Sequence, residues 1–215
     1  MKVLACIFDL DGVIVDTARY HYLAWKRLAE ELGFYFSEKN NERLKGVSRM
    51  TSLNILLETG GIKLPEENKL QLAGKKNILY KEYISKLSPD DILPGTKEFL
   101  NAVAEKKLKL GIGSASKNTH LILKNIGLDK FFDSVVDGNK IHRAKPDPEV
   151  FLNVAYELNI PPGNCVVFED AVAGIQAARN GGMTCVGIGS DKILHEADLV
   201  VKSLKEMTME KLYSL

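Results

Sequence analysis

Short apolar runs alternate with segments of helical periodicity over most of the chain. The first run, KVLACIF at residues 2–8, is continuous and apolar, which is typical of a strand buried on both faces of a sheet. From Thr17 the apolar positions change to the spacing of a helix, and Gly33 is a typical residue for ending it. The apolar positions that recur on this helix are Tyr20, Leu23, Ala24, Leu28 and Leu32.

The pattern stays helical to about Leu87. It is interrupted at KGVS, residues 45–48, and at Gly60-Gly61, where glycine favours a break between helices. The segment LSPDDILPGT at residues 87–96 combines proline, glycine and acidic residues and is interpreted as a linker. A block of helices therefore separates the first strand from the remainder of the chain.

After this linker, helices and strands alternate regularly. We expect helices over residues 96–106, 118–126, 148–158 and 171–180. The strands expected between and after them are LKLGIGS (108–114), SVVD (134–137), CVVFED (165–170), TCVGIG (184–189) and ADLVV (197–201). This order predicts βαβ units, and so an α/β fold with a Rossmann-like parallel sheet flanked by helices. The tail after Val201 carries no motif, and we expect it to finish the outer edge of the sheet.

Composition narrows the classes of function. The 29 Lys and Arg residues balance 28 Asp and Glu residues, so no overall positive field recruits nucleic acid or an anionic membrane. The amino terminus lacks the long apolar stretch of a signal peptide or membrane span. Cys6, Cys165 and Cys185 are widely spaced within apolar runs, which predicts free thiols in a reducing cytoplasm. We expect a cytoplasmic protein, monomeric, with a small-molecule partner.

Polar residues follow several of the predicted strands. Asp9 and Asp11 end the first strand, Ser114 ends the second, and Glu169-Asp170 end a later one. Taken singly, the paired aspartates are typical of a turn, and Glu169-Asp170 of a helix N-cap. Together they meet at the carboxyl edge of a parallel sheet, where ligands bind. Carboxylates gathered there would repel one another without a cation, and oxygen ligands of this kind suit Mg²⁺.

Two further segments supply groups that attract an anion. Lys145 in KPDP follows the third predicted strand and lies at the same edge, although such a lysine is also typical of a solvated helix start. The hydroxyl of Ser114 and the backbone amides of SASKN enter a helix in a way that suits phosphate, and equally a polar cap. These residues predict attack of a carboxylate on phosphorus, with the second carboxylate moving a proton.

Four segments together identify a family resemblance. FDLDGVIVDT (8–17), GSASKN (113–118), KPDPEVF (145–151) and FEDAVAGIQAA (168–178) resemble, in order and spacing, the signature segments of the haloacid dehalogenase superfamily. The inserted helical block resembles the small α-helical cap of that superfamily. The resemblance implies a core domain of residues 1–15 and 92–215 and a cap domain of residues 16–91.

Further segments narrow the resemblance. DTARYHYLAWKRLAEE (16–31), ERLKGVSRMTSL (42–53), KKN (75–77) and SASKN are similar to the members that interconvert β-D-glucose 1-phosphate and glucose 6-phosphate. This similarity implies a Mg²⁺-dependent phosphomutase that works through an aspartyl-phosphate enzyme, with β-glucose 1,6-bisphosphate as activating intermediate. It implies that Asp9 is the nucleophile and Asp11 the general acid and base.

The same similarity implies roles for the other site residues. Mg²⁺ would be held by Asp9, the carbonyl of Asp11, Asp170 and Glu169. The transferred phosphoryl group would be bound by Ser114, Ala115 and Lys145. The other phosphate of the bisphosphate would be bound by Arg49, Ser116, Lys117 and Asn118. Thr17 and His21 would position Asp11. The sugar-facing residues of the cap would be Trp25, Lys45, Gly46, Val47, Ser52 and Lys76.

Other interpretations of these residues remain open at this point. Thr17, His21 and Trp25 lie four apart, which is also the pattern of a packed helix face. Lys45 and Arg49 have the spacing of an ordinary charged surface, and we expect Tyr80 and Tyr83 only to pack within the cap. The alternative activity is a sugar-phosphate phosphatase of the same superfamily. A non-catalytic protein on this scaffold is disfavoured, because the nucleophile, metal ligands and lysine are all present.

Overall fold

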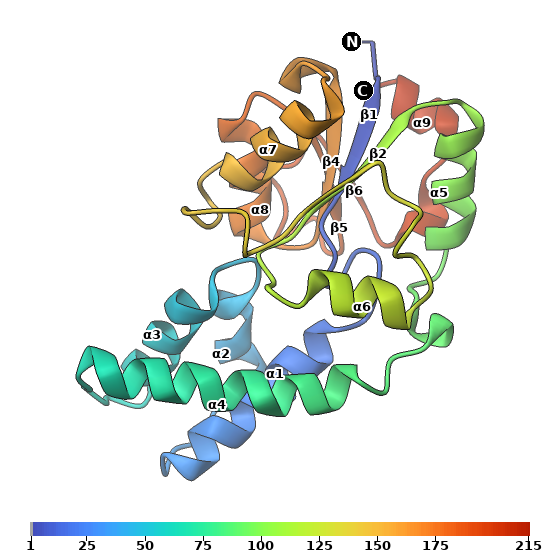
Figure 1. Ribbon diagram of the computed structural model, residues 1–215. Helices are drawn as coiled ribbons and strands as arrows, with labels where there is room; N and C mark the ends of the chain where they lie inside the picture. Colours follow the sequence, from blue (N-terminus) through green and yellow to red (C-terminus); the bar gives the residue numbers. More distant parts are fainter. Residues whose placement is uncertain (1) are drawn as a thin grey trace.

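The computed structural model describes residues 2–215 and contains a six-stranded parallel sheet (Figure 1). The strand order is β3-β2-β1-β4-β5-β6. The strands are β1 (Ala5–Phe8), β2 (Lys109–Gly113), β3 (Ser134–Val136), β4 (Cys165–Glu169), β5 (Thr184–Ile188) and β6 (Leu199–Val201). Because the order reverses direction at β1, the carboxyl end of β1 lies at the switch point where open α/β sheets bind ligands.

Helices cover both faces of the sheet (Figure 1). Along β1, Cys6 and Phe8 pack in one hydrophobic cluster, with α5 (Thr96–Glu105), α6 (Thr119–Asn125) and α9 (Met209–Tyr213). Ala5 and Ile7 pack in the other, with α7 (Glu149–Leu158) and α8 (Val172–Asn180). Successive side chains of a strand point to opposite faces, so a continuous apolar strand fills both clusters.

A separate group of helices lies beyond the carboxyl ends of the strands (Figure 1). It consists of α1 (Ala18–Glu31), α2 (Glu38–Asn41), the short 3₁₀ helix η1 (Glu42–Leu44), α3 (Arg49–Thr59) and α4 (Glu66–Ile84). Trp25, Leu28, Phe36 and Leu53 belong to a hydrophobic cluster of this group alone. The second half of α4 instead packs with the cluster of the sheet through Tyr80 and neighbouring residues. We call this group the helical cap.

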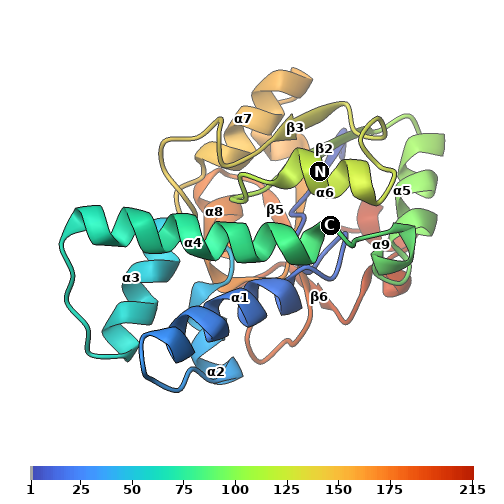
Figure 2. The ribbon, with the colours of Figure 1, turned by 60° about the horizontal axis from the view of Figure 1, so that its bottom comes forward.

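Helix α4 also lies beside α6 of the sheet domain (Figure 2). The side chain of Asn118 donates a hydrogen bond of 3.0 Å to Asn77 Oδ1, and Asn125 donates one of 2.9 Å to the carbonyl of Ile84. Both bonds join α4 to α6 or to the residue that precedes it. The cap is therefore fastened to the sheet domain at two points that are two helical turns apart.

The predicted alternation of strands and helices is confirmed, and so is the α/β class with a helical insertion. The precise division at residues 16–91 stays a prediction. The tail was wrongly predicted: after Val201 it forms the 3₁₀ helix η4 (Leu204–Glu206) and α9, among the described residues, and β6 is the edge strand. Leu204 and Leu212 turn inward to the hydrophobic cluster, so the tail covers a face of the sheet. None of the helices within residues 2–215 is long and apolar enough to cross a bilayer.

Candidate active site

Asp9 directly continues the first strand. Its backbone N–H donates a hydrogen bond of 2.9 Å to the carbonyl of Phe168 in β4, which fixes the position of a residue that is only 5% exposed. Three residues later, Gly12 has a φ of +85°, a conformation that glycine adopts without strain. A Cβ atom on Gly12 would lie 2.2 Å from Oδ2 of Asp170. Glycine therefore allows both the turn out of β1 and the close approach of the loop to Asp170.

Lys145 bridges the carboxylates of Asp9 and Glu169. Its ammonium group donates hydrogen bonds of 2.5 Å to Asp9 Oδ1 and 2.8 Å to Glu169 Oε2. Burial alone would lower the pKa of Lys145, but the charges of Asp9 and Glu169 and the bonds to them raise it above its usual value. The lysine is therefore a fixed positive charge beside Asp9.

The side chain of Glu169 is fully buried and has both oxygens occupied. Oε2 accepts the bond from Lys145, and Oε1 accepts one of 3.1 Å from the backbone N–H of Ala171. Helix α8 approaches closely enough that a Cβ atom on Gly174 would lie 1.9 Å from the carboxyl carbon of Glu169. Glycine in FEDAVAGIQAA is therefore the residue that lets this carboxylate fit under the helix.

Asp9, Glu169 and Asp170 form a compact group of carboxylates. Each offers one oxygen, and these atoms lie within 4.8 Å of one another. Burial, together with the charges of Glu169 and Asp9, raises the pKa of Asp170 well above its usual value. Lys145 supplies one positive charge against these three carboxylates, so a divalent cation fits the remaining charge. The donor set is made of hard oxygens, which suits Mg²⁺.

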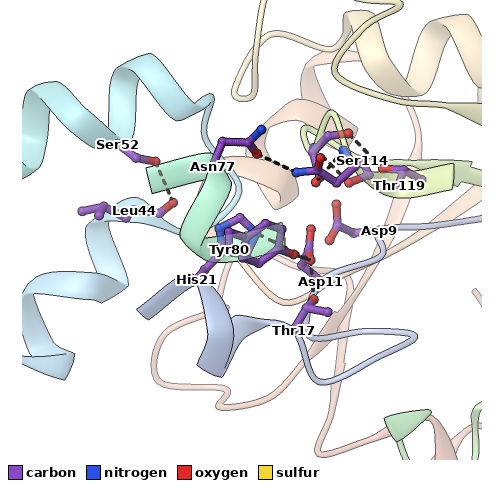
Figure 3. Close-up of polar contacts among 12 residues, drawn as sticks. Asp9, Asp11, Thr17, His21, Leu44, Ser52, Asn77, Tyr80, Ser114 and Thr119 are labelled. Atoms are coloured by element: carbon purple, nitrogen blue, oxygen red, sulfur yellow. Dashed lines mark hydrogen bonds and ion pairs between the residues drawn. The ribbon is translucent and has the colours of Figure 1, made fainter. Parts of the chain in front are cut away.

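Asp11 turns away from this group toward the helical cap (Figure 3). Its Oδ1 accepts hydrogen bonds from the hydroxyl of Thr17 and, at 3.3 Å, from that of Tyr80. Nε2 of His21 lies 3.8 Å from the same oxygen. Burial and the neighbouring charge of Asp9 raise the pKa of Asp11 to about 6, against the lowering effect of Thr17. Side chains from the cap thus fix the orientation of Asp11.

The side chain of Lys76 is surrounded by the rings of His21, Trp25 and Tyr80. Its ammonium group lies 2.9 Å from His21 Nδ1, 4.7 Å from the centre of the Trp25 ring and 4.5 Å from that of Tyr80. Burial first, and then the charge of Arg49, lowers the pKa of Lys76 well below its usual value. Burial and the charges of Lys76 and Arg49 likewise lower the pKa of His21, which favours the neutral imidazole.

The loop after β2 folds back on itself through its hydroxyl groups. The N–H of Ser116 donates to Ser114 Oγ at 3.1 Å, and the N–H of Asn118 donates to Ser116 Oγ at 3.2 Å. Ser114 is fully buried, and the side chain of Asn118 donates a hydrogen bond to Asn77 of the cap. The loop therefore presents polar groups in a fixed arrangement between the sheet domain and the cap.

A cavity of about 470 Å³ collects most of the residues predicted from the sequence. Those that line it are Asp9, Asp11, His21, Trp25, Lys45, Gly46, Val47, Arg49, Ser52, Lys76, Ala115, Ser116, Lys117, Asn118 and Asp170. Thr17, Ser114, Lys145 and Glu169 are buried and contact or adjoin residues of the lining. The structure thus brings the predicted residues from both domains to one place, although their roles remain predictions.

Several residues of the site, among them Tyr80, Asn77 and Asn41, have no catalytic or binding role in the sequence-based prediction. Tyr80 packs as expected, but its hydroxyl also reaches Asp11. Asn77 binds Asn118, and Asn41 lines the cavity. The helical periodicity can place Tyr80 and Asn77 on α4, but it does not show which loops of the sheet domain face that helix. The sequence gives one signal, which is that Asn77 belongs to KKN, a segment that resembles the phosphomutase members of the superfamily.

Comparisons with known proteins agree with this geometry. Residues 3–182 match the family model described as haloacid dehalogenase-like hydrolase. The chain is 43% identical over 211 residues to the β-phosphoglucomutase of Bacillus subtilis strain 168, covering 97% of this chain and 93% of the relative. It is 35% identical over 182 residues to a phosphorylated carbohydrates phosphatase of Thermotoga maritima, covering 83% and 82% respectively.

A solved structure shows the same arrangement. The crystal structure of β-phosphoglucomutase from Clostridium difficile superposes with a TM-score of 0.94 at 43% identity, covering 99% of this chain and 96% of that one. The fold, the order of the four motifs and these full-length similarities lead to one conclusion. This chain is an enzyme of the haloacid dehalogenase-like hydrolase family, of the type that transfers phosphoryl groups.

Proposed function

We propose that the protein is a phosphomutase that interconverts β-D-glucose 1-phosphate and glucose 6-phosphate. The observation that carries this proposal is that a single cavity has phosphate-binding groups at two places. Asp9, with Lys145 beside it, lines the cavity at the carboxyl end of β1, while Arg49 lines it from the start of α3 in the cap and Asn118 from the loop after β2. A substrate with two phosphates occupies both places, whereas hydrolysis of a monophosphate requires only the first. Similarity to the relatives of 43% identity supports the same choice.

The cycle begins from an enzyme phosphorylated on Asp9. The C6 hydroxyl of β-glucose 1-phosphate attacks this phosphorus and gives its proton to Asp11. The bond between phosphorus and the Asp9 oxygen breaks, which leaves β-glucose 1,6-bisphosphate and the free carboxylate of Asp9. The bisphosphate then turns over in the site. A carboxylate oxygen of Asp9 attacks the phosphorus at C1, the bond to the C1 oxygen breaks, and Asp11 returns the proton to that oxygen. Glucose 6-phosphate leaves, and phosphorylated Asp9 is regenerated, so atoms and charge balance over the cycle.

Lys145 and the loop after β2 stabilise the transferred group. Lys145 stays protonated between Asp9 and Glu169, so its charge opposes the repulsion between the attacking carboxylate and the phosphoryl oxygens. Asp9, Asp170 and the Asp11 carbonyl would hold Mg²⁺, and Glu169, whose oxygens are already occupied, would chiefly position Lys145. The ion would supply charge neutralisation and align the reacting oxygens.

The contacts of Asp11 suit its role in moving the proton. A group that alternates between acid and base works best when its pKa lies near the working pH, and that of Asp11 is raised to about 6. Thr17 and Tyr80 hold the carboxylate so that its orientation depends on the position of the cap. Proton transfer is then coupled to closure of the cap over a sugar phosphate, a coupling that favours the sugar hydroxyl over water.

A coupled assay tests the proposed function. The protein is given β-glucose 1-phosphate, Mg²⁺ and a catalytic amount of β-glucose 1,6-bisphosphate, and glucose 6-phosphate and free phosphate are measured together. We expect glucose 6-phosphate to form far faster than free phosphate, and to stop forming when EDTA removes the metal. Rapid release of phosphate without isomerisation would instead identify a sugar-phosphate phosphatase, the activity named for the Thermotoga maritima relative.

A variant of the nucleophile provides the control. Asp9→Asn keeps the size of the side chain but removes the attacking carboxylate, so turnover should disappear while the thermal unfolding curve stays cooperative. Intact-protein mass spectrometry should detect the added phosphoryl group on the wild type and not on the variant. Substantial mutase activity of Asp9→Asn would contradict the assignment of the nucleophile.

A further inference from the structure

Asn41 is a buried polar residue with an unused hydrogen-bond acceptor. It is the last residue of α2, it is only 7% exposed, and its side-chain Oδ1 has no hydrogen-bond partner. Among the described residues 2–215, Oδ1 of Asn41 is the only buried side-chain oxygen or nitrogen atom without a hydrogen-bond partner. A polar group buried without a partner costs about 1–3 kcal/mol, so its presence requires a reason.

The ordinary structural roles of asparagine do not supply that reason. Asn41 occupies the N-cap position of η1, where an asparagine side chain usually accepts a backbone N–H, but its side chain makes no such bond. The start of α2 is capped instead by Ser37 and Asn40. The side chain of Asn41 therefore caps neither of the two helical segments that the residue joins.

The position of Asn41 points to a ligand. It lines the same cavity as Asp9 and Asp11, on the part of the wall that the cap contributes. Other cap residues that line the cavity include Trp25 and Leu44, which offer an apolar surface, and Ser52, whose hydroxyl already donates a hydrogen bond of 3.4 Å to the Leu44 carbonyl (Figure 3). The Oδ1 atom itself is buried, so a molecule in the cavity meets this acceptor once the terminal amide turns toward it.

We propose that the Asn41 amide recognises one of the ring hydroxyl groups of the hexose and so helps to determine which sugar phosphates are accepted. This inference rests on the proposed function, since it takes a hexose phosphate as the occupant. The phosphates are bound by charged groups and loop amides, which leaves the hydroxyls between them to contact the cap. Rotation of the terminal amide by half a turn exchanges Oδ1 and Nδ2, so either atom can face the hydroxyl.

A hydrogen bond from Asn41 to one hydroxyl would make the enzyme discriminate between sugar phosphates that have and lack that hydroxyl. A substrate with the correct hydroxyl satisfies the buried amide, while an analogue without it leaves the amide unpaired inside a closed site. At a cost of about 1–3 kcal/mol, the analogue should lose about 5- to 150-fold in kcat/KM. Replacing Asn41 by an apolar residue should remove this discrimination, because no unpaired group then remains.

The test compares a panel of substrates across matched variants. The 2-, 3- and 4-deoxy analogues of β-glucose 1-phosphate are assayed with the wild type, Asn41→Leu and Asn54→Leu. Asn54 is a matched control because it lies on α3 of the same cap, is exposed and does not line the cavity. We expect the wild type and Asn54→Leu to disfavour one analogue by about 10-fold or more relative to the parent. Asn41→Leu should accept that analogue within about 3-fold of the parent, with the other ratios unchanged.

The stability of the free protein separates recognition from a structural role. Leucine is close in size to asparagine and replaces an unpaired acceptor with an apolar group, so the thermal midpoint of Asn41→Leu should be equal to or higher than that of the wild type. A smaller replacement, Asn41→Ser, should also lower the discrimination. The proposal is overturned if the ratio of kcat/KM between each deoxy analogue and the parent stays at its wild-type value in both variants. This includes the case in which both variants lose activity equally toward every substrate.

Failure of this inference differs from failure of the proposed function. The proposed function is judged by whether the wild type isomerises the parent substrate, whereas the role of Asn41 is judged by ratios between analogues. If the wild type releases phosphate without isomerising, the same ratios are measured from free phosphate. The role of Asn41 is then supported or overturned by the same criteria.

Discussion

The ammonium group of Lys145 lies 2.5 Å from Asp9 Oδ1, although 136 positions separate the two residues in the chain. Lys145 follows β3 and Asp9 follows β1, and the parallel sheet places both at its carboxyl edge. Glu169 receives the other bond of the lysine, so a buried positive charge is shared between a nucleophile and a supporting carboxylate.

Removal of this lysine should destabilise the protein as well as stop the reaction. Lys145→Met leaves Asp9 and Glu169 buried without their cation, and breaking a buried ion pair in this way typically costs about 3–5 kcal/mol. Urea denaturation measures the change. As a control, Lys75→Met removes an exposed partner of Glu31 and should cost no more than about 1 kcal/mol. If the two variants had the same free energy of unfolding, the buried ion pair would contribute no more to stability than the exposed one.

Substitution of Gly12 should disturb the metal site directly. In Gly12→Ala the new Cβ would collide with Oδ2 of Asp170, at 2.2 Å, so Asp170 must move and the affinity for Mg²⁺ should fall. Gly33→Ala is the matched control, because Gly33 also has a positive φ, +87°, but nothing lies within 4 Å of a Cβ there. Both variants bear the backbone strain, and only Gly12→Ala should need more Mg²⁺ for half-maximal activity. Equal metal requirements would contradict the collision argument.

Replacement of Asp11 should slow proton transfer without unfolding the protein. We expect Asp11→Asn to lower kcat by about 10²–10⁴-fold, which is the usual contribution of a general acid and base. Asp16→Asn removes a nearby carboxylate that pairs with Arg19 at 3.6 Å, and it should retain near wild-type activity. Steady-state kinetics at saturating substrate make the comparison. A fully active Asp11→Asn would refute the role of the carboxylate.

Loss of Arg49 should separate isomerisation from hydrolysis. Arg49→Ala removes a guanidinium group that lines the cavity and is proposed to hold the second phosphate, so isomerisation should fall more steeply than the slow release of free phosphate. Both products are measured in one reaction. Arg43→Ala, which removes an exposed partner of Glu58 in the same cap, should leave their ratio unchanged. If the two rates fell equally in Arg49→Ala, the second phosphate site would lose its support.

Asp133 should give the fold a small pH-dependent stabilisation far from the active site. Burial opposes its charge, but a 2.7 Å bond from Lys109 and a 2.9 Å bond from the N–H of Leu110 prevail and lower its pKa. The stabilisation is therefore complete above the unfolded value, about 3.9, and is lost as the pH falls through the lower folded value. Because the side chain is 37% exposed, the effect should not exceed about 1 kcal/mol.

Chemical unfolding across a pH series checks this expectation. The free energy of unfolding of the wild type should exceed that of Asp133→Asn at pH 7, and the difference should shrink as the pH falls below about 4. A difference that is constant with pH would mean that the charge of Asp133 is irrelevant and only its shape matters.

Much of the fold could be predicted from local patterns. The continuous apolar run at residues 2–8 predicts a strand covered on both faces, and β1 (Ala5–Phe8) lies within it. The breaks at residues 45–48 and Gly60-Gly61 match the ends of η1 and α3. The tail could not be predicted in this way. Its few apolar side chains, such as Leu204 and Leu212, show that it is buried but not which surface it covers.

The candidate site, like the fold, was predicted only in part from the sequence. The sequence by itself determined which residues stand at the ends of strands, because strand periodicity and the signature segments are local properties. Only the tertiary structure decided that Tyr80 reaches Asp11, that Lys145 bridges Asp9 and Glu169, and that Asn41 has no partner. Hydrogen bonding and burial depend on which distant segments meet in space, and no pattern along one segment contains that information.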